Sequence, residues 1–215
     1  KYVITSFLLK SGISRIDYII LTESSKDILE GTAHLLGKFD AQYLWTNGSK
    51  LSSGVWEEIK DRNIKWKDIQ RGYEPLYIGK TKIELPFRPS TDNRRYGNNK
   101  VLVTINHENL NIVIGDNFST YNNISAGDKN ISDSHKKKII YSPYLKNSES
   151  LDNLVQFYNP HVLITKDIGF NYSKPQKTEI YEITNQGMIK VVSNNKSLKL
   201  APTIDKYNKY FIILL

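Results

Sequence analysis

Apolar residues in the first part of the chain alternate between helical and strand-like spacing. Helical spacing predicts helices over residues 3–11, 28–39 and 55–59; Gly12 is expected to end the first, and Ser52 and Ser53 to cap the last. Continuous apolar runs predict strands at residues 18–22 and 43–45. This alternation of helix and strand favours an α/β architecture.

The middle of the chain changes to strand-like alternation and then returns to alternating helices and strands. Residues 73–87 alternate as a strand does, and two apolar runs on either side of His107-Glu108-Asn109 predict a hairpin. Four further elements are expected: strands at 138–141 and 162–165, a helix at 151–157 and a hairpin at 179–192 with Gly187 at its turn. Two sheets with helices outside them suit an αββα sandwich, although periodicity equally allows an ordinary α/β layer fold.

A chain of 215 residues, 39% hydrophobic, is long enough for one sizeable core. We therefore expect a single domain over residues 1–200. Residues 201–215 end in an apolar tail, which we expect either to dock as a strand or to continue into further chain. No apolar run approaches the roughly 18 to 20 residues that a membrane-spanning helix needs, so no transmembrane segment is expected in this stretch.

Basic residues exceed acidic ones by 30 to 22, giving a formal net charge of +8 and a pI near 9.4. The excess gathers in a long polar loop at 88–100 and in the run 136–138, and the loop also contains an aromatic ring. Guanidinium and ammonium groups beside aromatic faces are typical of single-strand nucleic-acid binders. The candidate DNA contacts are Arg88, Arg94, Arg95, Tyr96, Lys100, Lys136, Lys137 and Lys138. A basic composition is equally common in proteins that bind no nucleic acid.

Several kinds of chemistry lack their residues. There is no cysteine, which excludes a disulfide framework, a thiolate nucleophile and a cysteine-ligated metal. Ser24-Ser25-Lys26 lacks the Ser-x-x-Lys spacing, and neither a Gly-x-Ser-x-Gly elbow nor a Gly-x-x-x-x-Gly-Lys phosphate loop occurs. We therefore expect no catalysis by these routes.

One segment has the layout of a metal-binding loop. Residues 19–31 run from an apolar strand ending in Leu-Thr, through a short polar loop, to a helix containing Ile-Leu-x-Gly. This layout resembles that of metallo-β-lactamase-fold hydrolases, whose His-x-His-x-Asp-His motif occupies the loop. The corresponding positions here are Glu23, Ser25, Asp27 and Ile28.

Further segments resemble one branch of that superfamily, the C-terminal domain of the ComEC family of DNA-uptake proteins. The lead-in at 7–18 resembles its leucine-rich helix followed by Gly-Ile and Ile-Asp, and Gly115-Asp116 resembles the end of the strand that delivers a bridging aspartate. Segments 98–105, 142–146, 171–175 and 181–192 follow in the family's order, so the resemblance spans roughly residues 3 to 192. The resemblance implies a metallo-β-lactamase-like αββα sandwich that lacks its first strands.

Most metal ligands of that family are replaced here. Tyr144 and Lys174 stand where later ligand histidines are found, Ile28 is apolar, and of the ligands only Asp27 and Asp116 are retained. We expect no cofactor, and any metal would be held by Asp27 and Asp116. Each aspartate also has an ordinary explanation, Asp27 as a helix N-cap and Asp116 as a turn residue.

Two carboxylates facing an empty site would repel each other unless a cation neutralised them. Our hypothesis is that Lys174 is that cation, pairing with Asp27, Asp116 and Glu23; a Lys174→Met protein of unchanged stability would contradict it.

Three functions remain open. By resemblance, the chain is a catalytically degenerate domain on the extracytoplasmic face of a bacterial cytoplasmic membrane, part of a larger membrane protein, retaining contacts with DNA or a partner. The first alternative is an active nuclease with a metal site rebuilt from Glu23, Asp27, Asp116 and one loop residue; an all-oxygen site favours Mg²⁺ or Mn²⁺ over zinc. The second is a structural module that docks on the membrane domain of its own parent chain.

Overall fold

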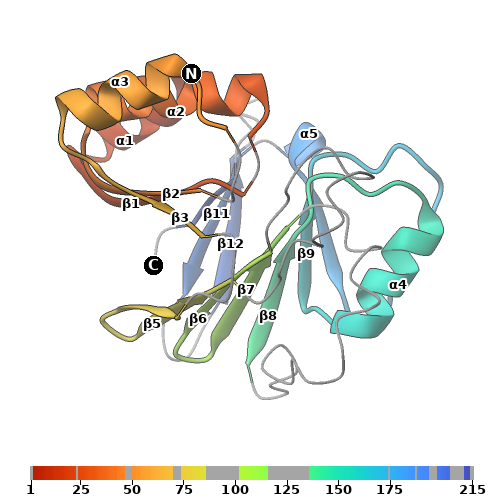
Figure 1. Cartoon of the computed structure of the whole chain (residues 1–215). Coiled ribbons are helices and arrows are strands. Elements are labelled where there is room, and N and C mark those ends of the chain that lie inside the picture. The colour runs from red at the N-terminus through yellow and green to blue at the C-terminus, as the bar shows by residue number, and fades with distance from the viewer. Residues whose placement is uncertain are drawn as a thin grey trace. The chain divides into compact units, whose positions relative to one another are not determined.

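The computed structural model describes residues 2–22, 24–46, 50–69, 74–85, 102–115, 136–173, 175–186, 188–193, 198–203 and 211–213. The fold is mixed α/β (Figure 1). Contacts between residues divide the chain into two compact units. Unit 1 comprises Lys1–Tyr73 and Arg88–Val101, and unit 2 comprises Glu74–Phe87 and Leu102–Leu215.

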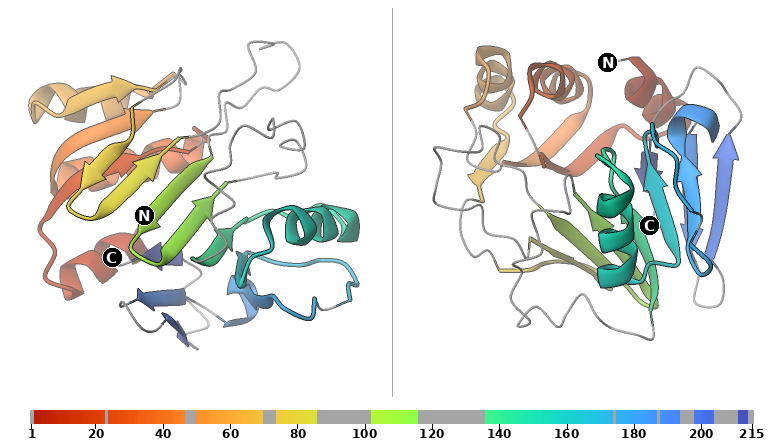
Figure 2. Two further views of the ribbon diagram at one scale, coloured as in Figure 1. Left: turned by 90° about the horizontal axis from the view of Figure 1, so that it is seen from below. Right: turned by 90° about the vertical axis from the view of Figure 1, so that its right-hand side faces the viewer.

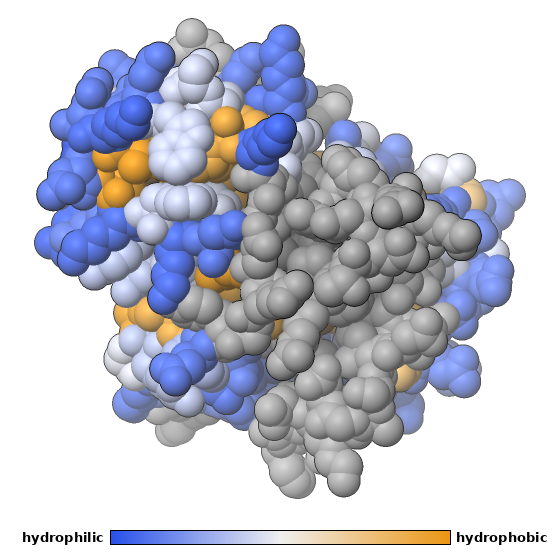
Figure 3. Space-filling view, in the orientation of Figure 1, coloured by the Kyte–Doolittle hydropathy of each residue, from blue (hydrophilic) through white to orange (hydrophobic). Residues whose placement is uncertain are grey.

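Unit 1 alternates helices and strands, as the apolar pattern predicts. Its elements in order are α1 (Tyr2–Lys10), β1 (Arg15–Ile20), α2 (Lys26–Lys38), β2 (Asp40–Thr46), α3 (Ser53–Asp61) and β3 (Lys65–Asp68). The strands form a parallel sheet in the order β1-β2-β3. In the orientation of Figure 3, mainly hydrophilic side chains, drawn in blue, occupy the outer rim of this unit.

Two helix boundaries in unit 1 follow from local chemistry. Gly12 adopts a left-handed conformation, with φ +72°, after the end of α1. The Gly12 N–H donates to the Leu9 carbonyl at 3.0 Å, and the Ile13 N–H donates to the Leu8 carbonyl at 2.9 Å, a glycine-terminated helix end. Ser52 caps α3, because its side chain accepts a hydrogen bond from the Val55 N–H at 3.4 Å. The predicted glycine stop and serine cap are confirmed.

The core of unit 1 lies between its sheet and helices α2 and α3. Leu36, Leu44 and Val55 are fully buried there. Burying an aliphatic side chain of this size contributes about 1.5–3 kcal/mol each. These contacts hold α2 and α3 against the sheet.

A seven-stranded sheet in the order β10-β9-β8-β7-β6-β5-β4 forms the centre of unit 2. Its antiparallel part contains β4 (Leu76–Ile78), β5 (Thr81–Glu84), β6 (Val103–His107) and β7 (Leu110–Ile114). Its parallel part joins β7 to β8 (Lys137–Tyr141), β9 (Val162–Thr165) and β10 (Glu179–Glu182). The predicted hairpin around His107 is confirmed, with a two-residue turn at Glu108 and Asn109.

The two faces of this sheet are covered differently. Helix α4 (Ser148–Tyr158) packs on one face, where Leu151 and Leu154 contact a cluster that includes Val113, Ile140 and Leu163 (Figure 1). The other face packs against a three-stranded sheet in the order β12-β11-β13. These strands are β11 (Met188–Ser193), β12 (Leu198–Thr203) and β13 (Phe211–Ile213), drawn in blue in Figure 2. Unit 2 therefore has a helix layer and two sheet layers.

The predicted hairpin at 179–192 is wrong. Strand β10 pairs in parallel with β9, helix α5 (Ile183–Gln186) follows it, and β11 belongs to the other sheet. Ile183 and Ile189 are both buried between the two sheets, so the chain crosses from one layer to the other instead of folding back on itself. Strand β13 pairs in parallel with β11. Among the helices of the described ranges, none is both long and apolar enough to cross a membrane.

Candidate functional site

The carboxyl ends of β7, β8 and β9 meet at one edge of the parallel part of the unit 2 sheet. The Gly115 N–H after β7 donates to the Tyr141 carbonyl at 3.1 Å, and the Ser142 N–H after β8 donates to the Ile164 carbonyl at 2.9 Å. In α/β sheets, ligands bind at this edge of the strands. The segments around Gly115 and Ser142, which resemble family ligand segments, thus lie on neighbouring strands at the same edge.

Two buried hydroxyl groups lie at this edge. Ser142 follows β8 and Thr165 ends β9, and both are fully buried. Within the described part of the chain, neither side-chain oxygen has a hydrogen-bond partner. Buried polar atoms are usually satisfied by protein or by an ordered water, so these two hydroxyl groups are exceptions within the described fold. Sequence reasoning missed Thr165, because a threonine closing an apolar strand is an ordinary strand residue.

Tyr144, a predicted vestigial ligand position, lies just beyond the same edge. It forms a parallel bridge with Asp167, and its side chain is 53% exposed. The Lys166 ammonium lies 5.6 Å from the centre of the Tyr144 ring, a cation–π geometry. An exposed ammonium group therefore lies beside the Tyr144 ring at this edge of the sheet.

The loop after β9 is tied to β10 through Glu182. Its carboxylate accepts hydrogen bonds from the Ile168 N–H at 3.4 Å and from the Asn185 side chain at 3.0 Å. Burial raises the pKa of Tyr172, and the charge of Glu182 raises it further. Glu182 therefore acts as an anchor for this loop, and Tyr172 is held in its neutral form.

Unit 1 contributes the positions of the first ligand motif. Ser25 is the N-cap of α2 by its backbone conformation, without a side-chain capping bond, and Asp27 lies exposed in the first turn. The prediction that Asp27 is the N-cap is wrong by two positions, although a carboxylate there still interacts favourably with the helix dipole. Ile28 is half-buried and packs against the core cluster of unit 1, so this position is occupied by a packing side chain.

The proposed ion-pair group stays a prediction. Glu23, Asp116 and Lys174 lie outside the described residues, and Asp27 belongs to the other unit from Asp116 and Lys174. Within the described ranges, no group of three or more His, Cys, Asp or Glu side chains has the geometry to hold a metal ion.

The candidate DNA contacts divide into three groups. Arg88, Arg94, Arg95, Tyr96 and Lys100 lie outside the described residues. Lys136 and Lys137 are half-buried, with part of each side chain open to solvent. Lys138 is only 8% exposed, and its ammonium donates to the Tyr158 carbonyl at 2.8 Å. The prediction of a DNA contact at Lys138 is therefore corrected: this lysine points into the fold and caps the end of α4.

Comparisons with known proteins identify weak structural similarities. No protein-family model matches the chain, and no curated protein matches it in sequence. A solved structure of a CmlA beta-hydroxylase mutant is similar over 71% of this chain with 12% identity and a TM-score of 0.47; the match covers 36% of that protein, so this chain spans about a third of its length. A diphosphatase of the PhnP family is similar over 83% of this chain and 73% of its own, with 10% identity and a TM-score of 0.45. Both TM-scores are below 0.5.

Proposed function

We propose that this chain is a metallo-β-lactamase-like domain that has lost metal-dependent catalysis and functions by contacting DNA, as the resemblance to the ComEC C-terminal domain suggests. The observation that supports the loss of catalysis most directly is the packing of Ile28. This residue occupies a family ligand position, and its side chain contacts the core cluster of unit 1. Replacing it with a ligand would require repacking that cluster.

The edge of the unit 2 sheet supports the same conclusion. The Lys166 ammonium against the Tyr144 ring supplies a positive charge near a second family ligand position. A two-metal hydrolase instead needs imidazole and carboxylate groups converging on its ions, because the ions lower the pKa of the attacking water. Without imidazole ligands at these positions, the chain would lack the means to generate that nucleophile.

Metal stoichiometry tests the loss of catalysis. We would incubate the full chain with Zn²⁺, Mn²⁺ and Mg²⁺, desalt it and measure bound metal by elemental mass spectrometry. We expect less than about 0.1 equivalent of any metal, because a tight site needs several deprotonated ligands. One or two equivalents that disappear in Asp27→Asn, but persist in the exposed helix control Asp61→Asn, would establish the alternative, an active hydrolase whose site includes Glu23, Asp27 and Asp116.

DNA contact is tested separately by fluorescence anisotropy with a labelled single-stranded oligonucleotide. We expect affinity that falls steeply as salt rises, since binding releases counterions from the phosphates. Absence of binding at low salt would refute DNA contact and leave docking on the membrane domain of the parent chain as the remaining role.

A further inference from the structure

The face of the unit 1 sheet opposite α2 and α3 carries aromatic and basic side chains that the proposed function does not yet account for. Strand register assigns alternate residues to each face, and Ile19 and Leu44 point to the helices. The opposite face, which we call the aromatic face, consists of Ile16, Tyr18, Ile20, Ala41, Tyr43, Trp45, Lys65 and Lys67.

Aromatic rings form the middle of this face. Tyr18 and Tyr43 are directly opposite each other on β1 and β2, and their rings stack with centroids 4.7 Å apart and planes inclined by 10°. Trp45 meets Tyr18 edge-on at 5.6 Å and 79°. Trp45 is 5% exposed, whereas both tyrosines are half-buried. The tryptophan therefore fixes the orientation of a tyrosine pair that keeps part of its ring surface open.

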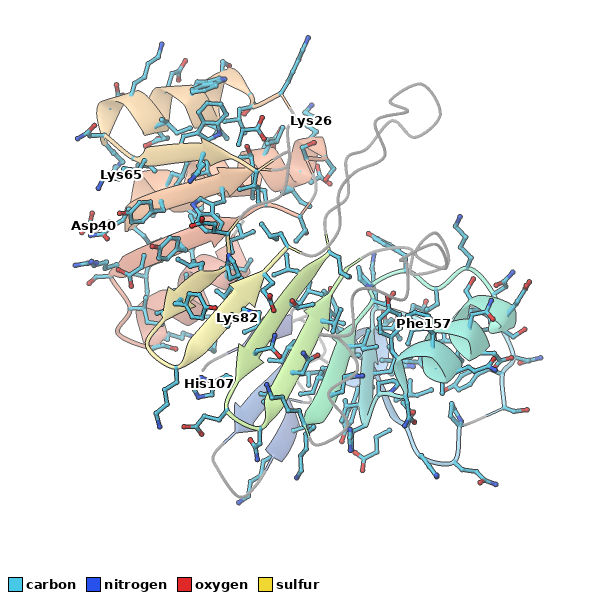
Figure 4. The ribbon with its side chains drawn as sticks, turned by 60° about the horizontal axis from the view of Figure 1, so that its bottom comes forward. Lys26, Asp40, Lys65, Lys82, His107 and Phe157 are labelled. Carbon is cyan, nitrogen blue, oxygen red and sulfur yellow. The ribbon has the colours of Figure 1, made fainter. Side chains whose placement is uncertain are left out.

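Positive charge lines the β3 side of the same face. Lys65 and Lys67 are both exposed, and they are separated by two residues of extended strand, about 6.6 Å. The Lys65 ammonium lies 5.2 Å from the centre of the Tyr43 ring and donates to its hydroxyl at 3.4 Å. Figure 4 labels Lys65 at the start of β3.

The carboxylates of this sheet are confined to one of its faces, where Arg15 pairs with Asp17. The acidic residues of its three strands are Asp17, Asp40 and Asp68, and register places all of them on the face opposite the aromatic one. The aromatic face thus has two cations and no carboxylate within its strands. This distribution is complementary to a polyanion with flat apolar groups.

We propose that the aromatic face binds single-stranded nucleic acid, with base faces lying over the exposed edges of the stacked Tyr18 and Tyr43 rings and successive phosphates contacting Lys65 and Lys67. The inference rests on the proposed DNA contact and assigns it a surface. Edge-to-face contact with these rings requires a base whose π-face is accessible, which a single strand offers and a duplex does not. Because every base has such a face, binding is expected to tolerate changes of sequence.

The test uses the full chain and a fluorescein-labelled oligo(dT). In a Tyr18→Leu, Tyr43→Leu double variant, which keeps apolar bulk but removes the rings, we expect the Kd to rise about tenfold, since the aromatic contacts of two rings are lost. Tyr77→Leu is the matched control, because Tyr77 is a 66% exposed tyrosine on β4 of the other unit. Tyr43→Phe retains the ring and is expected to bind as the wild type does.

The lysines are tested independently, because exposed lysines can be replaced without disturbing the core. In Lys65→Gln, Lys67→Gln we expect the slope of log K against log salt to become less steep by about 1.4, the value for two phosphates of a single strand. Lys38→Gln, Lys60→Gln, with two exposed lysines from the last turns of α2 and α3, is the control and is expected to leave the slope unchanged.

Three results would overturn the inference. If the wild type binds no oligo(dT), the proposed function fails with it. If the wild type binds but neither the tyrosine nor the lysine variant differs from its control, DNA contact stands and the aromatic face is not its surface. If a matched duplex binds as tightly as the single strand and the tyrosine variant is unaffected, contact between bases and this face is refuted. Should the tyrosine variant fail to fold, as judged by circular dichroism, the lysine variant decides.

Discussion

Replacing Lys138 tests whether this basic residue stabilises the fold or contacts DNA. Its ammonium donates at 2.8 Å to the carbonyl of Tyr158, the last residue of α4, and the side chain is 8% exposed. That carbonyl has no partner within the helix, because the last four carbonyls of any α-helix lack one. Lys138 therefore links β8 to the end of α4 across the unit 2 core.

The expected cost of Lys138→Met can be worked out from this contact. A hydrogen bond to a charged group contributes about 1.5–3 kcal/mol, and a cation at a helix C-terminus adds about 0.3–1 kcal/mol. Methionine offsets part of this loss, because it fills a similar volume and avoids burying a charge. We expect a net loss of about 1–3 kcal/mol, which lowers Tm by roughly 2–12 °C in a chain of this size.

The assay is thermal unfolding by circular dichroism, paired with the oligo(dT) titration described above. Lys137→Met is the matched control, because Lys137 is the neighbouring strand residue and is half-buried. It is expected to leave Tm nearly unchanged. The structural role would be refuted if Lys138→Met kept the wild-type Tm and lowered the DNA affinity as much as Lys137→Met does. In that case Lys138 would be a DNA contact, as the basic run predicts.

Alkaline pH is expected to destabilise the protein. The hydrogen bond to Glu84 raises the pKa of Lys82, although desolvation opposes this shift. Burial raises the pKa of Tyr181, and the hydrogen bond to Glu179 raises it further. Burial also raises the pKa of Tyr172. Groups whose pKa is raised in the folded state contribute stability that is complete below the unfolded values of 10.0 and 10.5 and is lost as pH rises above them. The urea midpoint should be level from pH 8 to about 9.5 and then fall, less steeply in Tyr181→Phe; an unchanged midpoint at pH 11 would contradict this. Gly12 and Gly31 both have open space for an added methyl group. Gly12→Ala should lower the free energy of unfolding by about 1 kcal/mol, because φ is +72° at this position after α1. Gly31→Ala, inside α2, should raise it by about 0.5–1 kcal/mol. Equal urea midpoints for the two alanine variants would show that backbone conformation does not control these sites.

Local signals in the sequence predicted local structure well. The glycine after α1 and the serine before α3 set helix boundaries through bonds to residues within one turn. Strand β7 and its partner β6 were also predictable, because a two-residue turn joins them directly. In each case the residues that determine the element are its own neighbours.

Partner choice was harder to predict than element type. Two apolar runs around Gly187 gave the same pattern as a hairpin, yet β10 pairs with β9 and β11 lies in another sheet. The difference arises from packing between layers, where Ile183 and Ile189 are buried. Such contacts join residues far apart in sequence and leave no local signature.

The candidate site shows the same limit. The run 136–138 has uniform charge, but alternation along β8 turns Lys138 toward α4, a direction that depends on register. The row of Tyr18, Tyr43 and Lys65 also depends on register and could not be predicted from the sequence. These residues come from three strands and meet only when β1, β2 and β3 align.

The parallel pairing of β13 with β11 has a consequence for the order of folding during synthesis. Strands β11 and β12 can pair once residue 203 has emerged, but the other edge of β11 stays open until residues 211–213 follow. An open strand edge is a template for pairing with other chains. During this interval, self-association of the nascent protein competes with completion of the β12-β11-β13 sheet. Slower translation of the residues between β12 and β13 would lengthen the interval.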